Sequence, residues 1–547
     1  MTFDALSRLS VETEPQNDWW RGASIYQIYP RSFADSNNDG IGDLPGITAH
    51  LDHVASLGVD AIWLSPFFTS PMHDFGYDIS DFRDVDPSFG NLDDFDQLLA
   101  KAHALGLKVI IDQVYSHTSN AHAWFQESRA SRDNSKSDWY VWADAKSDGS
   151  PPNNWQSVFT GPAWSWDAQR GQFYLHNFLT QQPDLNVHNR KVQDALLETM
   201  KFWLDRGVDG IRLDAVNFMM HDRTLTDNPP VPVGQGKRTR PFDFQHHFHN
   251  QSQPEIPDFL TRIRAVADTY PGCFLVAEVG GEQAQEEMTL YTRPGDYLHS
   301  AYGFLYLYAD QLDAELVRKS VELWPDDTVT GWPSWTFSNH DAPRAVSRWA
   351  DESHRKSFSD MALLLLVALR GSVFIYQGEE LGLAQSNIPF DRLQDPEAIC
   401  NWPKTLGRDG ARTPMPWLSK SPHAGFSETE PWLPVDARHY DLAVDLQDKD
   451  PHSTLNHARQ ILRLRNQNAA LRTGNMRVID SSCEDLLIFE RGEDHEAVLC
   501  VFNLGKTAYD WSLPVGWTVF ERINCPEGEL AQLGPYAGLM ARRKQAL

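Results

Sequence analysis

The feature that most constrains the fold is a repeated alternation of short apolar runs and longer amphipathic stretches. Each run has four or five mostly apolar residues, as expected for a strand that is buried on both faces of a parallel sheet. The stretches between them, such as Asp93 to Leu105 and Val192 to Leu204, have the periodicity of helices. The eight runs are Ile25 to Tyr29, Ala61 to Leu64, Lys108 to Asp112, Gly210 to Leu213, Phe274 to Ala277, Phe304 to Leu307, Ser334 to Phe337 and Val373 to Tyr376.

Eight strand–helix units predict an α/β fold, a closed (β/α)8 TIM barrel formed by residues 16–117 and 182–468. Residues 118–181 are rich in Asp, Ser, Asn, Trp and Pro and are too long for a simple loop, so we expect an inserted subdomain after the third strand. Beyond a helix near Leu455 to Asn466, residues 469–547 alternate in strand fashion, which predicts a C-terminal antiparallel β domain.

Charge and cysteine usage narrow the classes of partner. Lys and Arg total 48 against 75 Asp and Glu, a formal net charge of −27, which disfavours nucleic acid, anionic membranes and phosphorylated substrates. No targeting pattern or membrane span is expected, since the longest apolar run, Met361 to Leu369, is too short. Five cysteines without paired spacing predict free, mostly buried thiols in a reducing, cytoplasmic compartment. A monomer and a homodimer are both compatible with the sequence, and no organic cofactor is expected.

Charged residues cluster just after the predicted strands, where TIM barrels place their active sites. The third run ends at Asp112 with His117 soon after, and the fourth, GIRLD, ends at Asp214. The fifth, FLVAE, ends at Glu278, and the seventh leads into SNHD, which ends at Asp341. Three strands therefore direct a carboxylate toward one mouth.

Crowded carboxylates favour glycoside hydrolysis. Mutual repulsion keeps one protonated and another ionised, so that one attacks the anomeric carbon while the other donates a proton to the leaving oxygen. Arg212, two residues before Asp214 on the same strand face, is placed to keep that nucleophile ionised, and His117 and His340 to bind sugar hydroxyls. Singly, each residue fits helix capping or loop binding equally well, and only their coincidence on several strands favours a site.

The motifs around these residues resemble those of a known enzyme family. The chain resembles the α-amylase superfamily, glycoside hydrolase family 13, in its α-glucosidase and oligo-1,6-glucosidase group, over almost its whole length. The motifs that carry the resemblance, in the family's order, are DQVYSH (Asp112 to His117), QPDLN (Gln182 to Asn186), GIRLD (Gly210 to Asp214), VAE (Val276 to Glu278) and SNHD (Ser338 to Asp341).

The resemblance implies roles for the strand-end residues. Asp214 matches the nucleophile and Glu278 the general acid and base of a retaining enzyme. Asp341 matches the third carboxylate, which binds and distorts the sugar. Arg212, His117 and His340 match contacts to the transition state.

It also implies a pocket for the terminal glucose. In DFGYD, Asp74 would bind the outer hydroxyls and Tyr77 would stack on the ring. Arg412 in GARTPMPW matches an arginine that neutralises Asp74, and such a pair would close the pocket and enforce exo-action. Phe159 and Phe178 would complete an apolar collar, although core packing is the plainer explanation for phenylalanine.

A structural cation site is expected in DSNNDGIGD. The first motif carries Ser116 where the family has a calcium-associated asparagine, so no calcium is expected there. DSNNDGIGD instead has oxygens at alternate positions and a sixth-position glycine, but lacks the bidentate Glu of a full calcium loop, since Gly46 stands there. It resembles the group's single Ca²⁺ or Mg²⁺ site; a metal-free polar turn is the alternative. The expected ligands are Asp35, Asn37, Asp39, the Ile41 carbonyl and Asp43.

Substrate preference depends on two further features. In this group a valine after the nucleophile accompanies α-1,6 specialists and smaller residues accompany α-1,4 activity; here the residue is Ala215. This favours maltose and short α-glucosides, with water or another alcohol, a sugar or a phenol, as acceptor. The stretch Met220 to Asn250 is expected to wall the leaving-group side and limit substrate length.

Other functions stay open on the same scaffold: an oligo-1,6-glucosidase, a sucrose-acting glucosylase and a trehalose-forming isomerase. A non-catalytic accessory protein is the alternative from another class. Such relatives carry a membrane anchor and lose the catalytic carboxylates, whereas this chain keeps all three.

Overall fold

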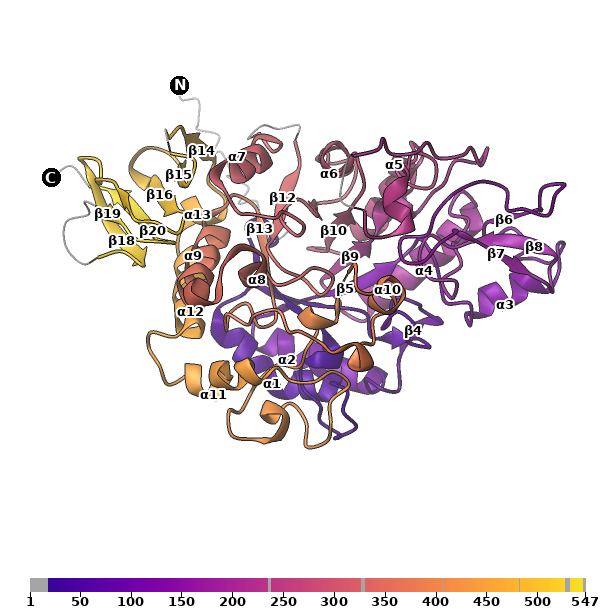
Figure 1. Cartoon of the computed structure of the whole chain (residues 1–547), viewed down its shortest axis with the longest axis horizontal. Coiled ribbons are helices and arrows are strands. Elements are labelled where there is room, and N and C mark those ends of the chain that lie inside the picture. The colour runs from indigo at the N-terminus through magenta and orange to yellow at the C-terminus, as the bar shows by residue number, and fades with distance from the viewer. Residues whose placement is uncertain are drawn as a thin grey trace, which may run out of the picture.

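The computed structural model describes residues 18–234, 238–325, 330–405, 407–481, 483–526 and 532–544. At its centre, eight parallel strands close into a barrel in the order β1-β13-β12-β11-β10-β9-β5-β2 (Figure 1). Residues 16–17 of the predicted barrel domain and 545–547 of the predicted C-terminal domain lie outside the described residues. The strands are β1 Ser24–Ile28, β2 Ala61–Leu64, β5 Lys108–Val114, β9 Gly210–Asp214, β10 Phe274–Val279, β11 Ser300–Gly303, β12 Trp332–Thr336 and β13 Ser372–Tyr376.

Seven of the eight barrel strands lie where the apolar runs predicted them, and the sixth does not. The run Phe304 to Leu307 forms a bend and turn, whereas the strand is β11, the four residues SAYG just before it. Strand β11 pairs with both of its neighbours, β10 and β12, and buries Tyr302. The more apolar run instead buries Tyr306 and Leu307. Hydrophobicity alone therefore selected the wrong segment.

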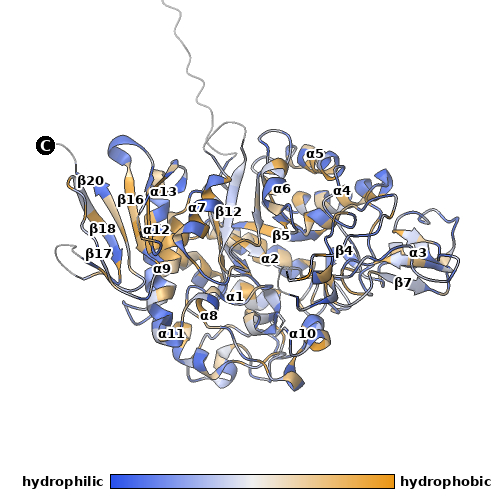
Figure 2. Cartoon of the chain, turned by 45° about the horizontal axis from the view of Figure 1, so that its top comes forward, coloured by the Kyte–Doolittle hydropathy of each residue, from blue (hydrophilic) through white to orange (hydrophobic). Residues whose placement is uncertain are grey.

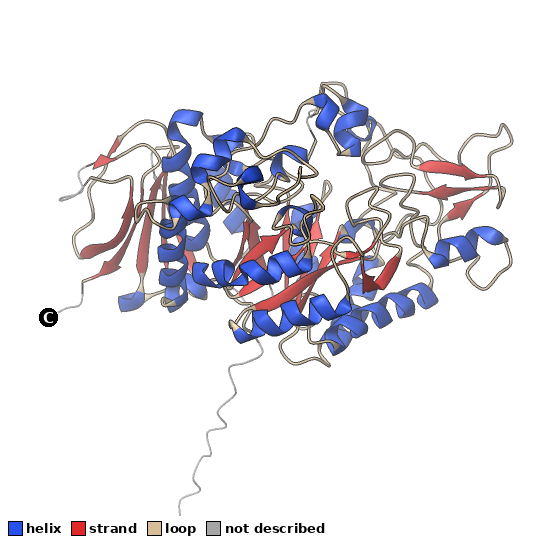
Figure 3. Cartoon of the chain, turned by 90° about the horizontal axis from the view of Figure 1, so that it is seen from below, coloured by secondary structure: helices blue, strands red, loops and turns tan. Residues whose placement is uncertain are grey.

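Helices surround the barrel strands (Figure 3). The predicted helices near 51–57, 93–105, 192–204 and 455–466 are confirmed within α1, α2, α4 and α12. Helix α1 begins after Asp43, whose side chain accepts a hydrogen bond from Gly46 N. The helices are α1 Leu44–Leu57, α2 Leu92–Ala104, α3 Ala123–Ala130, α4 Arg190–Asp205, α5 Ile256–Ala267, α6 Ala284–Tyr291, α7 Ala314–Glu322, α8 Ala345–Trp349, α9 Arg355–Ala368, α10 Pro396–Asn401, α11 Val444–Gln447, α12 Thr454–Asn466 and α13 Ala469–Arg472.

Alternation along each strand separates the outer core from the barrel interior. In β9, Ile211 and Leu213 pack into the cluster shared with the helices, so Arg212 and Asp214 face inward. In β10, Phe274 and Val276 belong to the interior cluster and Glu278 follows on the same face. The period of two thus places the charged residues inside the carboxyl end of the barrel.

Two antiparallel sheets flank the barrel, as the sequence predicted. The inserted sheet β6-β8-β7 and helix α3 lie at one end of the molecule, and the five-stranded sheet β14-β15-β16-β20-β18 lies at the other (Figure 1). Strand β16 is coloured largely hydrophobic in Figure 2, in keeping with its fully buried residues. The remaining strands are β3 Phe68–Thr69, β4 Asp81–Val85, β6 Trp142–Ala143, β7 Trp164–Asp167, β8 Gln172–Leu175, β14 Met476–Ile479, β15 Leu486–Arg491, β16 Val498–Asn503, β17 Tyr509–Asp510, β18 Trp517–Ile523, β19 Gln532–Leu533 and β20 Gly538–Arg543.

The lengths of the helices and the state of the cysteines can be compared with the sequence predictions. Within the described residues, none of the helices combines the length and apolar character needed to cross a bilayer. The five cysteines are all free; Cys273 and Cys500 are buried, Cys483 and Cys525 are partly buried, and Cys400 is exposed.

A buried arginine joins α12 to the barrel. Arg465 is fully buried and donates hydrogen bonds to the carbonyls of Gly22, Val367, Leu369 and Gly371. The carbonyl of Gly371, just before β13, lies 2.5 Å from Arg465 Nη2. These buried carbonyls therefore depend on the Arg465 side chain for hydrogen bonds.

We predict that Arg465→Met lowers the free energy of unfolding by at least about 2 kcal/mol, since buried carbonyls lose their donors. Urea unfolding followed by circular dichroism measures the change. The control is Arg463→Met, because Arg463 lies on the same helix but is exposed. Equal losses in the two variants would contradict this account.

Candidate active site

The three predicted carboxylates converge at the carboxyl end of the barrel. Asp214 is the last residue of β9, Glu278 lies near the end of β10, and Asp341 follows β12. All three line one cavity of about 230 Å³. The register places Asp214 beside β5 on one side and β10 on the other.

Arg212 connects the carboxylates. Its Nη1 lies 2.6 Å from Asp214 Oδ1 and 2.5 Å from Asp112 Oδ1, and its Nη2 lies 2.7 Å from Glu278 Oε2. Its Nη2 also donates to the Tyr302 hydroxyl at 3.0 Å. The contact with Asp214 expected from the strand pattern is therefore present, and the same guanidinium also contacts two further acids.

Burial and neighbouring charges give the three carboxyl groups different pKa values. Burial raises the pKa of Glu278 to about 8 and that of Asp214 to about 7, and Arg212 opposes both shifts. Burial also acts on Asp341, but His340, Arg412 and Arg408 outweigh it and hold the Asp341 pKa below its usual value. Near neutral pH, Glu278 therefore retains a proton most readily and Asp341 is ionised.

The cavity lining includes a buried ion pair, but its arginine is not the one predicted. Arg408 Nη2 lies 2.9 Å from Asp74 Oδ1, and Gln182 Nε2 donates to Asp74 Oδ2 at 3.0 Å. The prediction that Arg412 pairs with Asp74 is wrong. Arg412 instead binds Asp341 at 2.6 Å and the His340 carbonyl at 2.7 Å.

The turn between the two arginines explains why Arg408, and not Arg412, contacts Asp74. Residues Asp409–Ala411 form a single 3-10 turn, so Arg408 and Arg412 stand at its two ends. Both lie within 3.5 Å of Asp341 Oδ1, but only Arg408 also contacts Asp74. Arg408 is also held by Asp395 at 2.8 Å. The motif around Arg412 was recognisable in the sequence, whereas the chain path that selects the partner was not.

The predicted aromatic and histidine residues lie at different depths. Tyr77 and His117 line the cavity, whereas His340 is completely buried behind Tyr77, on which its ring stacks at 5.4 Å. His340 Nε2 lies 2.5 Å from the Tyr77 hydroxyl. His340 therefore orients Tyr77 and Asp341 and has no direct opening to the cavity.

The aromatic collar is present and larger than predicted. Phe159 and Phe178 line the cavity with their ring centroids 5.8 Å apart, and Arg408 lies over the Phe159 ring. Several cavity residues were missed, because no sequence motif marks them; they lie on the segments after β9 and β11, on α10 and just after it. They are Phe218, Arg240, Phe242, Phe304, Tyr308, Glu397 and Arg408.

The loop predicted to bind a cation folds on itself. Asp35 Oδ1 accepts from Asn38 N at 2.7 Å, Asp39 Oδ1 accepts from Ile41 N at 2.9 Å, and Asn37 Nδ2 donates to Asp39 Oδ2 at 3.1 Å. Asp43 caps α1. Hard oxygen donors suit Ca²⁺ or Mg²⁺. Within the described part of the chain, no three His, Cys, Asp or Glu side chains converge to hold a metal, so an ion would also require the Asn37 amide and the Ile41 carbonyl.

Comparison with known proteins identifies the family. Residues 27–474 match the family described as the alpha amylase catalytic domain. The chain belongs to the α-amylase family. It is 52% identical over 513 residues, 92% of each chain, to a probable alpha-glucosidase of Rhizobium meliloti (strain 1021). It is 35% identical to an oligo-1,6-glucosidase of Heyndrickxia coagulans, covering 91% of this chain and 94% of that protein.

Solved structures of similar proteins agree with the fold. An alpha-glucosyl transfer enzyme, XgtA, superposes with a TM-score of 0.91 at 50% identity, covering 96% of this chain and 99% of that chain. The trehalulose synthase MutB from Pseudomonas mesoacidophila gives a TM-score of 0.87 at 31% identity, over 97% and 100% of the two chains. The protein is an α-glucosidase-type glycoside hydrolase of family 13.

We predict that Arg408→Met lowers kcat/KM for a terminal α-glucoside about 100-fold. Removing one partner of a buried ion pair costs about 3 kcal/mol, because Asp74 is left buried with less compensation. Steady-state kinetics measure the loss. The control Arg392→Met removes a partly exposed arginine, paired with Glu430, from the same stretch of chain and leaves kcat/KM unchanged. A near-normal value for Arg408→Met would refute the assignment of this pair to the glucose end.

Proposed function

We propose that this protein is an exo-acting, retaining α-glucosidase that removes terminal α-1,4-linked glucose from maltose and other short α-glucosides. The observation that carries the proposal is the single buried guanidinium of Arg212, which contacts both Asp214 and Glu278. One guanidinium can contact both carboxylates only when they are close. Retaining enzymes need a separation of roughly 5–5.5 Å.

The chemistry then divides between the two acids. Asp214 Oδ attacks the anomeric carbon as the glycosidic C–O bond breaks, and Glu278 gives its proton to the departing oxygen. The product of this step is a covalent glucosyl ester on Asp214. Glu278, now ionised, takes a proton from water, which attacks the same carbon and releases α-glucose. Asp341, held ionised by its arginines, binds sugar hydroxyls of the distorted ring.

Exo-action is proposed on the Asp74–Arg408 pair, which is buried and lines the cavity. A charged, hydrogen-bonded pair suits the outer hydroxyls of a terminal glucose, and a pair that closes the cavity there would exclude a longer chain. Tyr77, His117, Phe159 and Phe178 line the same cavity.

The preference for α-1,4 bonds rests on Ala215. This residue lines the cavity next to Asp214 and has a left-handed backbone conformation, with φ 40°. A β-branched residue is costly in that conformation and takes more of the leaving-group space. Similarity to an alpha-glucosyl transfer enzyme also supports transfer of glucose to alcohols other than water.

We expect maltose to release α-glucose as the first product, with isomaltose cleaved more slowly and sucrose and trehalose tested beside them. Proton NMR follows both the rate and the anomeric form. Ala215→Val should lower the ratio of kcat/KM for maltose to that for isomaltose, because it narrows the leaving-group side. The ratio cancels any general loss caused by backbone strain.

The outcomes separate the parts of this proposal. β-Glucose as first product would exclude retention, and a preference for isomaltose would exclude only the linkage assignment. Isomerised disaccharides as the main products would favour a sucrose- or trehalose-acting isomerase. Inactivity on all four sugars would favour a non-catalytic role.

The pH dependence of kcat/KM should be bell-shaped. Asp214 must be ionised to attack, so activity rises as the pH passes through its pKa of about 7. Glu278 must be protonated to donate, so activity falls as the pH passes through its pKa of about 8. With p-nitrophenyl α-glucoside, whose leaving group needs no proton, Glu278→Gln should lose the alkaline limb and keep the acid limb. An alkaline limb that persists in Glu278→Gln would assign it to another group.

We also propose one structural Ca²⁺ or Mg²⁺ ion in the loop from Asp35 to Asp43. Asp35, Asn37, Asp39, the Ile41 carbonyl and Asp43 would hold it. Asn38 at φ 63° and Gly40 at φ 89° adopt the left-handed conformation that lets the loop coil around a cation. The loop precedes α1 and contacts Glu428 through Asn38, so an ion there would stiffen the junction between two distant parts of the chain.

EDTA should lower the Tm by at least about 2 °C, and Ca²⁺ or Mg²⁺ should restore it, because an ion that binds only the folded state stabilises it. Elemental analysis should find one ion per chain. Asp39→Ala should abolish both effects, whereas Asp84→Ala, which removes an exposed aspartate elsewhere, should preserve them. A Tm that does not respond to EDTA, with no bound metal, would exclude the site.

A further inference from the structure

A chain of buried side-chain amides connects the end of the inserted subdomain to the loop between β9 and α5. Asn177 Nδ2 donates to Asp184 Oδ2, and Asn250 Nδ2 donates to Asn177 Oδ1 at 2.8 Å. Asn228 Nδ2 in turn donates to Asn250 Oδ1 at 2.8 Å. All four side chains are buried. Because Asn177 directly precedes Phe178, which lines the cavity, the amide chain lies next to the cavity wall.

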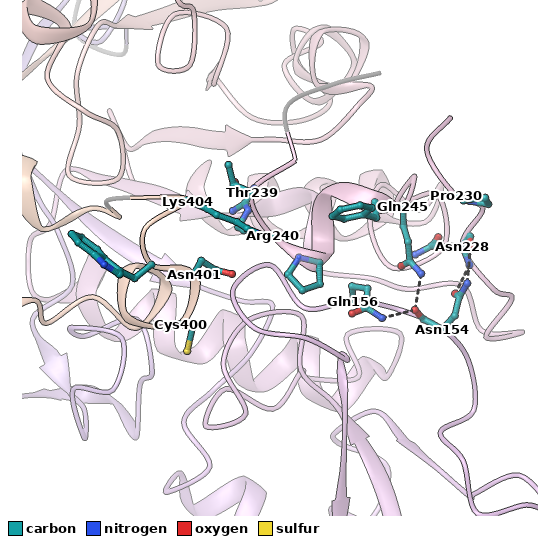
Figure 4. Close-up of a pocket in the computed structure, with 13 residues that line it drawn as sticks. Asn154, Gln156, Asn228, Pro230, Thr239, Arg240, Gln245, Cys400, Asn401 and Lys404 are labelled. Atoms are coloured by element: carbon teal, nitrogen blue, oxygen red, sulfur yellow. Dashed lines mark hydrogen bonds between the residues drawn. The ribbon is translucent and has the colours of Figure 1, made fainter. Parts of the chain in front are cut away.

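A backbone donor fixes the direction of these hydrogen bonds. The N–H of His249 donates to Asn228 Oδ1 at 3.1 Å, so the nitrogen of that amide must face Asn250. Asn250 Oδ1 is therefore an acceptor, and Asn250 Nδ2 donates onward to Asn177. Figure 4 shows Asn154 of the inserted subdomain bound to Asn228: Asn154 Nδ2 donates to the Asn228 carbonyl at 2.9 Å, and Asn228 N donates to Asn154 Oδ1 at 2.8 Å. Each amide thus has one orientation in which no donor faces a donor.

His247 contacts both this amide chain and an aromatic residue of the cavity. Its Nδ1 lies 3.1 Å from Asn250 Oδ1, and its Nε2 lies 2.9 Å from the Phe242 carbonyl oxygen. Its ring stacks on the Phe242 ring, with the centroids 3.5 Å apart and the planes 8° apart. His247 is buried, and Phe242 lines the cavity. His247 therefore links the position of Phe242 to the amide chain.

Both ring nitrogens of His247 face acceptors. The Phe242 carbonyl has no hydrogen to donate, and the amide chain fixes Asn250 Oδ1 as an acceptor. A neutral imidazole has one N–H and can make only one of the two hydrogen bonds, whereas an imidazolium makes both. The link between Phe242 and the amide chain is therefore complete only when His247 is protonated.

Charged and titratable groups around the His247 ring come from two segments. Arg240 and Asp243 belong to the same loop and pair with each other at 3.0 Å. Glu282 follows β10 and pairs with His246 at 2.7 Å. Both carboxylates raise the pKa of His247, but the two hydrogen bonds of the ring act on it more strongly than these charges do.

Burial opposes protonation of His247 more strongly than all these groups favour it. The pKa of His247 therefore lies below its ordinary value, and the ring is neutral at neutral pH. As the pH falls through this pKa, the ring gains its second N–H and with it the second hydrogen bond. The link to Phe242 is thus incomplete at neutral pH and complete in mild acid.

We propose that His247 is a positioning residue that sets leaving-group selectivity: it fixes Phe242 in the cavity wall, and protonation of His247 tightens this hold. The inference rests on the proposed glucosidase function, in which the stretch Met220 to Asn250 walls the leaving-group side. When His247 is neutral, one of its two hydrogen bonds is lost and Phe242 is held less firmly. Leaving groups of different shape are then discriminated less.

The ratio of kcat/KM for maltose to that for isomaltose measures this effect. Both sugars need Asp214 ionised and Glu278 protonated, so the titration of these two carboxyl groups cancels in the ratio. Lowering the pH from about 7.5 to about 5 protonates His247. The ratio should then move further from one by about threefold, which is the scale of one net hydrogen bond.

Two matched substitutions separate His247 from its neighbour. His247→Phe keeps a ring that can stack but removes both hydrogen bonds, so its ratio should be closer to one and independent of pH. The control is His246→Phe, because His246 is partly exposed and stacks on the exposed Phe248 instead of a cavity residue. The control should keep a ratio that depends on pH.

A third substitution changes the pKa of His247 and keeps its ring. Asn250→Asp places a carboxylate beside Nδ1 and favours the imidazolium, so the change in the ratio should move to higher pH by about one unit or more. Thermal unfolding followed by circular dichroism verifies that each variant is folded. A purely structural role of His247 would instead lower kcat/KM for both sugars in the same proportion at every pH.

The proposal would be overturned if the wild-type ratio did not change with pH, or if His247→Phe kept the wild-type pH dependence. In either case, cleavage of maltose and isomaltose would leave the glucosidase function intact. Failure of the wild-type enzyme to cleave any α-glucoside would instead refute the proposed function, and the role of His247 with it.

Discussion

The buried charge of Arg212 is the constraint on which the site depends. A guanidinium with no solvent exposure is tolerated only when anionic and hydrogen-bonding partners surround it. Here those partners come from β5, β9, β10 and β11, so four adjacent strands must keep their register for the charge to be compensated. The same contacts hold two carboxylates close together, which like charges would otherwise resist.

Two further arginines, Arg408 and Arg412, form ion pairs with the other carboxylates of the site. Arg408 contacts Asp74 and Asp395, and both Arg408 and Arg412 contact Asp341, from the two ends of one 3-10 turn. These acids are thus compensated by two arginines, whereas Asp214 and Glu278 share the single cation Arg212. This partition explains why Glu278 shows the stronger tendency to hold a proton and Asp341 the stronger tendency to lose one.

Long loops supply the outer part of the cavity. Phe242 and Arg240 come from the excursion after β9, Phe304 and Tyr308 from the segment after β11, and Glu397 from α10. None of them is marked by a sequence motif, although Phe304 directly follows β11. The catalytic level is therefore built by strands, whereas the surroundings of the leaving group are built by loops.

The pattern of residues along the chain predicts the barrel, the two flanking sheets and the three convergent carboxylates. Periodicity sufficed there, because alternation along a strand decides which side chains face inward and strand ends in a barrel meet at one mouth. Three other features became visible in the folded chain: β11 is SAYG, Arg408 rather than Arg412 pairs with Asp74, and His340 lies behind Tyr77. These outcomes depend on which residues far apart in the chain compete for the same space and the same charge, and local sequence carries no record of that competition.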